Sequence, residues 1–349
     1  DLSILSLGAI DVPRGRDAME YEIEYILKTT EAEVCVVENL DLYKKLTSVI
    51  DRLPTLKYII AIDEAGIDLG DKVLSYKALL SRGQERLGFE GEREIIEREV
   101  MLGDENDTAT IIFTSGTTGL AKGVMSTHGN FLYICSVGNA LYPFKKGEKW
   151  LSVLPVWHSF ERIIQYLFIS LSHTIVYSKP IGKIMLTDIQ RENPDYMGSV
   201  PRIWETVKAG VYQNVRSMSK VKKALFNFFL SVGKHYSNAE KKVLGSTAHT
   251  KSGSVMTDRV LGFFPYIILK PFNLLGQKLV FSQVKNKLGK NFKFGISGGG
   301  SMGKDVEEFF AAVGIKLLNG YGMTETGPVI GISDTRCPKK AFIAPLPNT

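Results

Sequence analysis

A loop rich in hydroxyl groups and glycines follows an apolar run about one third of the way along the chain. It reads Thr114-Ser115-Gly116-Thr117-Thr118-Gly119-Leu120-Ala121-Lys122-Gly123. Glycines let the backbone approach an anion closely, and successive N–H groups in such a loop can form an anion-binding nest. The hydroxyl groups add donors, and Lys122 adds a point charge that suits a phosphate. The pattern favours a polyphosphate site over a plain exposed turn.

The loop is not of the Walker A type, which requires Gly before the Lys and Ser or Thr after it. Here Ala121 precedes Lys122 and Gly123 follows it. Together with the next segment, residues 124–130, the loop instead resembles the signature of the adenylate-forming, or AMP-binding, superfamily. The usual pattern has Pro where this sequence has Ala121, and Pro there would only stiffen the turn. The resemblance implies that ATP is a substrate, with the loop and Lys122 on its phosphates.

A second motif, Asn319-Gly320-Tyr321-Gly322-Met323-Thr324-Glu325-Thr326-Gly327, resembles the second signature of the same superfamily. The resemblance implies that Tyr321 stacks on adenine beside Gly322, and that Thr324 bonds the α-phosphate. It also implies that Glu325 holds Mg²⁺, with Thr117 as a further candidate ligand. One carboxylate fits a hard cation that takes its other ligands from phosphates. A carboxylate that merely starts a helix beside a Gly turn is the alternative for Glu325.

A third segment places Gly298, Gly299, Gly300 and Ser301 directly after a predicted strand. Taken alone, three consecutive glycines fit a plain turn equally well. In the superfamily the similar segment packs against adenine, because small residues let the flat base approach. The resemblance therefore adds these four residues to the expected nucleotide site.

The segment Leu154-Pro155-Val156-Trp157-His158-Ser159-Phe160-Glu161-Arg162 resembles the superfamily loop whose His lies at the acyl pocket. Its Phe-Glu-Arg ending is most similar to that of long-chain enzymes. The resemblance implies that His158 is a gate or a positioning group for the acyl substrate. A purely structural histidine is the alternative, since a lone His is more often structural.

Apolar runs alternate with amphipathic stretches along the chain, which predicts an α/β fold with largely parallel, buried strands. We expect strands at 34–37, 58–62, 109–113, 150–154, 174–177, 196–200, 292–297 and 316–318, and helices near 19–27, 40–50, 130–141 and 305–313. Ligands bind beyond the carboxyl ends of such strands, where both Gly-rich loops should lie. The resemblance implies the large N-terminal domain of the adenylate-forming enzymes, with layered sheets flanked by helices.

Residues 212–290 break this alternation, and long-chain members of the family carry extra helical sequence there. Residues 205–293 carry a net charge of +13, whereas the rest of the chain carries −7. Lysines flank Phe-rich stretches, which suits an element lying at an anionic membrane surface. A buried helix with a solvated lysine face is the alternative. We expect no nucleic-acid partner.

Composition fits an ordinary globular protein, with 44% hydrophobic and 23% charged residues among 349. The three cysteines are far apart and indicate neither a zinc site nor a disulfide framework, so a reducing compartment is expected. The N-terminus resembles no signal peptide, and no run of about 20 apolar residues is present. These features predict a cytoplasmic location, with peripheral contact at the inner face of the membrane.

The combined resemblance implies an AMP-forming acid–thiol ligase of the long-chain-fatty-acid–CoA ligase class. It would convert a long-chain fatty acid, ATP and CoA to acyl-CoA, AMP and pyrophosphate through an acyl-adenylate. The alternatives are acyl transfer to an acyl carrier protein, and a non-catalytic module that binds nucleotide or lipid. Residues 1–349 resemble a partial large domain, truncated at both ends and without the small C-terminal domain, so we expect weak MgATP binding and poor turnover.

Overall fold

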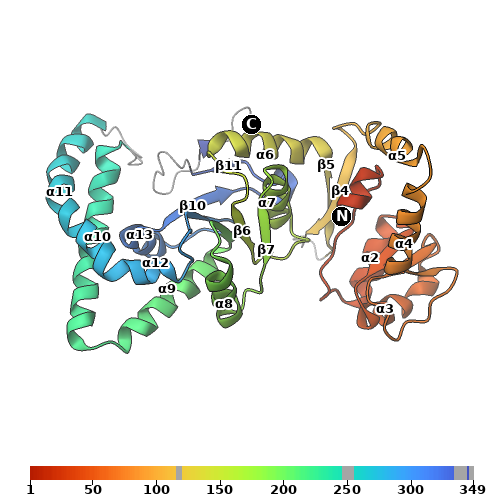
Figure 1. The fold of residues 1–349 in the computed structure, drawn as a ribbon, viewed down its shortest axis with the longest axis horizontal. Helices are drawn as coiled ribbons and strands as arrows, with labels where there is room; N and C mark the ends of the chain where they lie inside the picture. Colours follow the sequence, from red (N-terminus) through yellow and green to blue (C-terminus); the bar gives the residue numbers. More distant parts are fainter. Residues whose placement is uncertain (115–119, 246–254, 334–343, 346–349) are drawn as a thin grey trace. The chain divides into compact units, whose positions relative to one another are not determined.

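The computed structural model describes residues 1–114, 120–245, 255–333 and 344–345. Two compact units are present, Asp1–His128 and Gly129–Thr349, and each is described by itself (Figure 1). Both units combine strands with helices, so the predicted α/β class is confirmed.

The first unit contains a parallel three-stranded sheet in the order β1-β2-β3 and an antiparallel pair, β4-β5. Its helices are α1 (Leu2–Ser6), α2 (Glu20–Thr29), α3 (Leu40–Thr47), the short η1 (Ile50–Arg52), α4 (Tyr76–Leu87) and α5 (Glu92–Val100). Its strands are β1 (Val34–Val37), β2 (Tyr58–Ala61), β3 (Val73–Ser75), β4 (Thr108–Thr114) and β5 (Lys122–Thr127). A core of its own includes Leu27, Val37, Leu46 and Ile59.

Strand β1 has its predicted bounds, but the prediction that it is fully buried is wrong. Val34 and Val36 remain 47% and 46% exposed, and Val37 alone in this strand is buried. Successive side chains alternate between the two faces of a strand, and Val34 and Val36 lie on the face that remains exposed, opposite Cys35 and Val37. Cys35 is half-buried, and desolvation raises the pKa of its thiol to about 11, as expected for an unreactive cysteine.

The second unit is built on a seven-stranded sheet in the order β12-β11-β10-β9-β8-β6-β7. The pairs from β10 to β7 are parallel, whereas β11 and β12 are antiparallel additions. The strands are β6 (Lys149–Ser152), β7 (Thr174–Tyr177), β8 (Tyr196–Ser199), β9 (Phe294–Ser297), β10 (Lys316–Tyr321), β11 (Gly331–Ile332) and β12 (Ala344–Pro345). The predicted strands in this region are confirmed to within a few residues.

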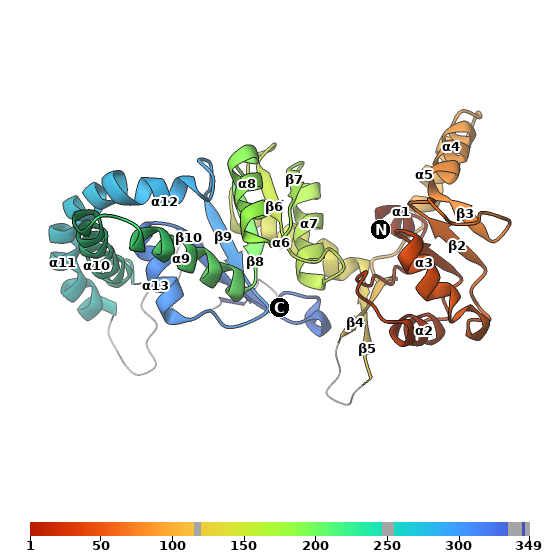
Figure 2. The ribbon, with the colours of Figure 1, turned by 90° about the horizontal axis from the view of Figure 1, so that it is seen from below.

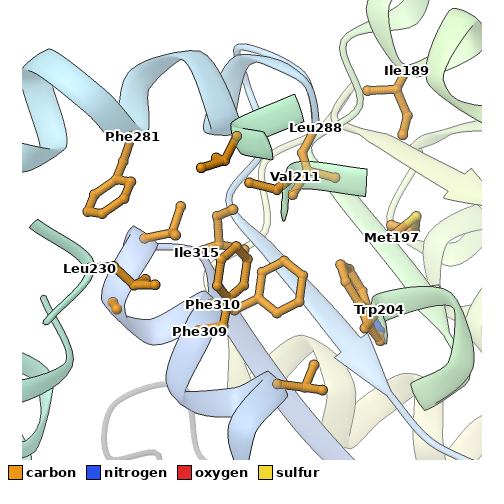
Figure 3. Packing of buried hydrophobic residues seen from close by; sticks show 14 of the residues in the cluster. Ile189, Met197, Trp204, Val211, Leu230, Phe281, Leu288, Phe309, Phe310 and Ile315 are labelled. Atoms are coloured by element: carbon orange, nitrogen blue, oxygen red, sulfur yellow. The ribbon is translucent and has the colours of Figure 1, made fainter. Parts of the chain in front are cut away.

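Helices surround this sheet. They are α6 (His128–Leu141), α7 (Ser159–Ser170), α8 (Gly182–Glu192), α9 (Pro201–Arg216), α10 (Lys220–Val243), α11 (Val255–Gly276), α12 (Ser282–Asn286) and α13 (Lys304–Val313), with short turns at η2 (Gln277–Phe281) and η3 (Thr324–Thr326). Helix α13 contacts α9, α10 and β10, so it lies between the sheet and the long helices. Its apolar side chains meet Trp204 and Phe281 in the main core (Figure 3).

The helix predicted near 305–313 is confirmed, and its apolar residues Val306, Phe309, Phe310 and Val313 are all buried. Gly314 ends the helix with φ of 79°, a left-handed conformation that suits glycine.

The basic region forms a helical hairpin, in which α10 and α11 lie side by side (Figures 1 and 2). One face of α10 is buried through Phe226, Phe229 and Leu230. Helix α11 instead exposes many large apolar side chains: Val255, Met256, Val260, Leu261, Phe263, Phe264, Ile267, Ile268, Phe272, Leu274 and Leu275. None of the helices within the described ranges has the length and apolar character that crossing a membrane requires.

Candidate nucleotide and acyl site

The predicted phosphate loop lies in the sequence between β4 and β5 of the first unit, which pair with each other antiparallel. Strand β4 ends at Thr114 and β5 begins at Lys122, and these two residues face each other across the antiparallel pair. The expectation that the loop follows a strand is confirmed, but its predicted place at the edge of a parallel sheet is wrong. Two antiparallel strands can be joined by such a loop directly, without a crossover helix.

The described end of this loop accepts a hydrogen bond from helix α2. The Tyr25 hydroxyl donates to the carbonyl oxygen of Ala121 at 3.0 Å. Lys122 is exposed, so its ammonium group is available to an anion. Ser115, Gly116, Thr117, Thr118 and Gly119 lie outside the described residues, and their predicted phosphate and metal contacts stay predictions.

The other predicted motifs meet in the second unit, at a cavity of about 300 Å³. Its lining includes His158 and Ser159 from the start of α7, Gly298 and Gly299 after β9, Tyr321 at the end of β10, and Gly322, Thr324 and Glu325 after it. Strands β9 and β10 are parallel neighbours, so the segments that follow them emerge at one edge of the sheet. The tertiary structure therefore brings together three motifs that are far apart in sequence; Ser159 and Thr324, for example, are 165 residues apart.

Small residues and one aromatic ring form part of the cavity wall. Tyr321 is 58% exposed, which leaves its ring free to stack on a flat base. Gly322 must be glycine, because a Cβ atom there would lie 2.0 Å from the Pro328 carbonyl oxygen. Gly298 and Gly299 line the cavity, whereas Gly300 and Ser301 are exposed and lie outside its lining.

The hydroxyl of Thr324 is tied to the start of α7. Its Oγ1 lies 2.9 Å from Oγ of Ser159, and both residues are buried. Glu325 is exposed at the same cavity. No group of three or more His, Cys, Asp or Glu side chains suited to a metal occurs in the part of the chain that the structure describes. A single carboxylate fits Mg²⁺ that is carried mainly by phosphate oxygens and water.

His158 both begins α7 and lines the cavity. Its Nδ1 accepts a hydrogen bond from the backbone N–H of Phe160 at 3.2 Å, so the imidazole is the N-cap of the helix. An accepting Nδ1 requires the neutral ring with its proton on Nε2. Desolvation lowers the pKa of His158, which also favours the neutral form.

An apolar wall completes the cavity, and sequence reasoning did not find it. Ile134 and Gly138 of α6 face Ile163, Ile164 and Leu167 of α7 across this part of the lining. A Cβ atom at Gly138 would lie 2.8 Å from Leu167. The apolar residues of α7 beside the His158 motif were the available signal. The cavity is therefore lined both by polar groups of the three motifs and by this apolar wall.

Glu161 lies in the first turn of α7, fully buried, and does not line the cavity. Its Oε1 accepts from Nε1 of Trp150 at 3.4 Å and from Nε2 of Gln165 at 3.3 Å. Burial raises the pKa of this carboxyl group. Glu161 therefore links the start of α7 to strand β6. This link holds Ser159 and Phe160, the two residues before Glu161, in place.

Known proteins resemble this chain over most of its length. The family model for "AMP-binding enzyme" matches residues 1–349. The chain is 31% identical to "Probable acyl-activating enzyme 16, chloroplastic" and 29% identical to "Long-chain-fatty-acid--[acyl-carrier-protein] ligase AEE15, chloroplastic", both from Arabidopsis thaliana. Each match covers 97% of this chain and 48% of the relative.

"Long chain acyl-CoA synthetase 6, peroxisomal", also from Arabidopsis thaliana, is 28% identical over 92% of this chain and 40% of its own length. The chain thus spans about half the length of the curated relatives it matches, or less. These names include organelles, and the cytoplasmic location predicted above stays a prediction.

Among solved structures, the chain resembles the crystal structure of a long-chain-fatty-acid-CoA ligase, FadD1, from Archaeoglobus fulgidus. The TM-score is 0.57 at 15% identity, and the match covers 97% of this chain and 52% of the other. At this identity the likeness shows the fold alone. It confirms the predicted fold, the N-terminal part of the adenylate-forming enzymes.

Proposed function

The chain belongs to the AMP-binding enzyme family, and we propose that it activates a long-chain fatty acid as an acyl-adenylate. The single observation that carries this proposal is a cavity with both polar and apolar lining. Tyr321, Thr324 and Glu325 line what we propose as its nucleotide end, and the apolar wall from α6 and α7 lines what we propose as its acyl end. An anionic nucleotide fits the first end, and an alkyl chain fits the second.

In the proposed reaction, a carboxylate oxygen of the fatty acid attacks the α-phosphorus of ATP, and pyrophosphate leaves. Holding both reactants in line removes much of the entropic barrier, and donors aimed at the phosphate oxygens stabilise the developing charge. Thr324 would donate to an α-phosphate oxygen, and Lys122 would neutralise the departing phosphates. Mg²⁺ held by Glu325, with Thr117 as a further ligand, would supply charge neutralisation on the phosphate oxygens.

His158 stands between the two ends of the cavity. Its neutral Nε2–H can donate to the carboxylate of the fatty acid, since Nδ1 is occupied by the helix cap. This orients the carboxylate toward the nucleotide end. The helix dipole of α7 favours the same placement, because its N-terminus carries partial positive charge.

Fatty-acid-dependent exchange of radiolabelled pyrophosphate into ATP tests the proposal directly. We expect exchange with long-chain acids, and a loss of roughly tenfold to hundredfold in Lys122→Ala and in Thr324→Val. Lys72→Ala, at another exposed lysine of the first unit, is the matched control and should retain the parent rate. A folded protein with no acid-dependent exchange would contradict adenylation and favour the binding module.

The second half-reaction is acyl transfer to a thiol, and we propose CoA as the acceptor. Support comes from the relative named as an acyl-CoA synthetase, whereas a more similar relative is named as an acyl-carrier-protein ligase. The two acceptors share the attacking thiol and differ in what carries it. Thioester formation should therefore be measured with CoA and with holo acyl carrier protein in parallel. Product with the carrier protein alone would assign the other acceptor.

We also propose that the hairpin of α10 and α11 contacts an anionic membrane surface. Helix α11 exposes many large apolar side chains, and exposed lysines occur on this helix and in the segment that follows it, including Lys270, Lys278 and Lys287. Such a helix lies in the interface plane, with apolar side chains in the lipid and cationic groups at the headgroups. Co-flotation with anionic but not zwitterionic vesicles is expected. No binding to anionic vesicles at low salt would contradict it.

A further inference from the structure

Ser159 and Thr324 form a hydroxyl pair that connects two sides of the cavity. Ser159 is 3% exposed and Thr324 is 9% exposed, and their oxygens lie 2.9 Å apart. In the part of the chain that the structure describes, neither hydroxyl has another hydrogen-bond partner. Both residues also line the cavity. The pair is therefore a buried polar contact next to the proposed reaction site.

The number of hydrogens in this pair limits what it can do. Each hydroxyl has one hydrogen and can accept, so a pair joined by one bond keeps one hydrogen for a third group. Thr324 is the less enclosed of the two residues. If Ser159 donates to Thr324, the Thr324 hydrogen is left to donate to a ligand oxygen. A chain of two hydroxyls also polarises each donor along its length.

The start of α7 contacts the second nucleotide segment as well. The ring of Phe160 lies where a Cβ atom of Gly298 would be only 3.1 Å away. Ser159 and Phe160 thus touch the segments that follow β10 and β9, respectively. The position of this turn does not depend on the Ser159 hydroxyl, because His158 caps the helix and Glu161 links it to β6.

We propose that Ser159 is a positioning residue, which orients the Thr324 hydroxyl toward an α-phosphate oxygen and so couples the acyl end of the cavity to the nucleotide end. This inference rests on the proposed function. Ser159 acts through Thr324 and touches no reacting atom. Its loss should therefore reduce the rate of adenylation more than the affinity for ATP, because the misoriented donor matters most when charge develops on the phosphate.

A double-mutant cycle tests this coupling. Ser159→Ala should lower acid-dependent pyrophosphate exchange at saturating ATP by roughly tenfold, with less than about a threefold change in KM for ATP. In a Thr324→Ala background, Ser159→Ala should change the rate by less than about twofold, since its target is gone. Ser159→Thr keeps a hydroxyl and should recover part of the loss. Ser170→Ala, at the exposed end of the same helix, is the control and should have no effect.

Multiplicative effects of the two substitutions would overturn the proposal, as would a change in KM alone. If the unsubstituted protein shows no exchange, the proposed function fails, and AMP binding then decides the coupling. The proposal then stands if AMP raises the melting temperature slightly less in Ser159→Ala than in the parent, within the small change in affinity allowed above, and equally in Thr324→Ala with and without Ser159→Ala. It is overturned if the two substitutions reduce the AMP-induced rise in melting temperature independently of each other. It is also overturned if AMP changes the melting temperature of neither the parent nor Ser159→Ala.

Discussion

At the scale of single residues, the helix cap made by His158 and its proposed hydrogen bond to the acyl carboxylate require the same protonation state. Nδ1 accepts the hydrogen bond that caps α7, and this bond is lost when the ring takes up a second proton. Desolvation lowers the pKa of His158 below its ordinary value of 6.5. The neutral ring is therefore favoured by folding, and the cap that it makes depends on pH.

The sign of that dependence follows from the lowered pKa. The stabilisation from His158 is complete above pH 6.5 and is lost as the pH falls through the lower value of the folded state. His158→Asn keeps a capping oxygen without the titration, so its melting temperature should fall less than that of the parent between about pH 7.5 and 5.5. His235→Asn, at an exposed histidine of α10, should behave like the parent. An identical pH dependence in His158→Asn and the parent would contradict this account.

At the scale of elements, an ionic cluster joins the amino ends of four parallel strands, opposite the candidate site. Glu148 precedes β6, and it pairs with Lys293 before β9 and accepts from the Tyr196 hydroxyl of β8 at 2.5 Å. Nε2 of His173, before β7, lies 3.5 Å from the same carboxylate. Burial alone would raise the pKa of Glu148, but hydrogen bonds from Lys145 N–H, Lys293 and Tyr196 lower it to about 2.

The lowered pKa predicts how acid affects this cluster. Glu148 stabilises the fold fully above pH 4.5, and this contribution is lost as the pH falls through about 2. Glu148→Gln should cost about 2 kcal/mol near neutral pH, since it removes charge-assisted hydrogen bonds. The difference from the parent should shrink toward pH 2. Urea unfolding across this range measures it, with the exposed Glu205→Gln as a near-neutral control.

Helix packing gives a second prediction at this scale. A Cβ atom at Gly233 of α10 would lie 2.6 Å from the backbone carbonyl oxygen of Ala312 in α13, whereas Gly210 of α9 has open space around it. Gly233→Ala should therefore destabilise the protein by about 1–3 kcal/mol, because backbone must move. Gly210→Ala should stabilise it by up to about 1 kcal/mol through helix propensity. Equal effects of the two substitutions in urea unfolding would rule out close packing as the cause.

At the scale of the whole molecule, charge and apolar surface are concentrated in one region. Residues 205–293 carry +13 against −7 elsewhere, and the same region contains the exposed apolar side chains of α11. Charge attracts the region to an anionic surface over about a Debye length, and apolar burial then provides the contact. The two contributions can be separated experimentally.

We expect Phe264→Glu combined with Ile268→Glu to abolish co-flotation with anionic vesicles, because both side chains are more than 60% exposed on α11. Raising the salt to about 0.5 M should weaken binding by the parent protein, since it screens the lysines. Leu102→Glu replaces an equally exposed leucine of the first unit and is the matched control. Loss of flotation in the control as well would show that the substituted charge, rather than the hairpin, decides binding.

Local pattern in the sequence determined a large part of this description. The bounds of β1 and β7, the stripe of α13 and its end at Gly314 all follow from residue spacing and local backbone preference. The motif residues His158, Tyr321 and Thr324 could also be chosen from the sequence, because their types and neighbours form recognisable signatures. Such features depend on residues within a few positions of one another, so the sequence carries them directly.

Only the tertiary structure decided which of these features meet. The exposure of one face of β1 depends on what packs against the sheet, and the place of the loop after β4 depends on the pairing of β4 with β5. Likewise, the contact of Ser159 with Thr324 and the apolar wall from α6 and α7 join segments that are distant in sequence. Long-range packing places these groups, and no short window of the sequence records which surfaces will be in contact once the chain has folded.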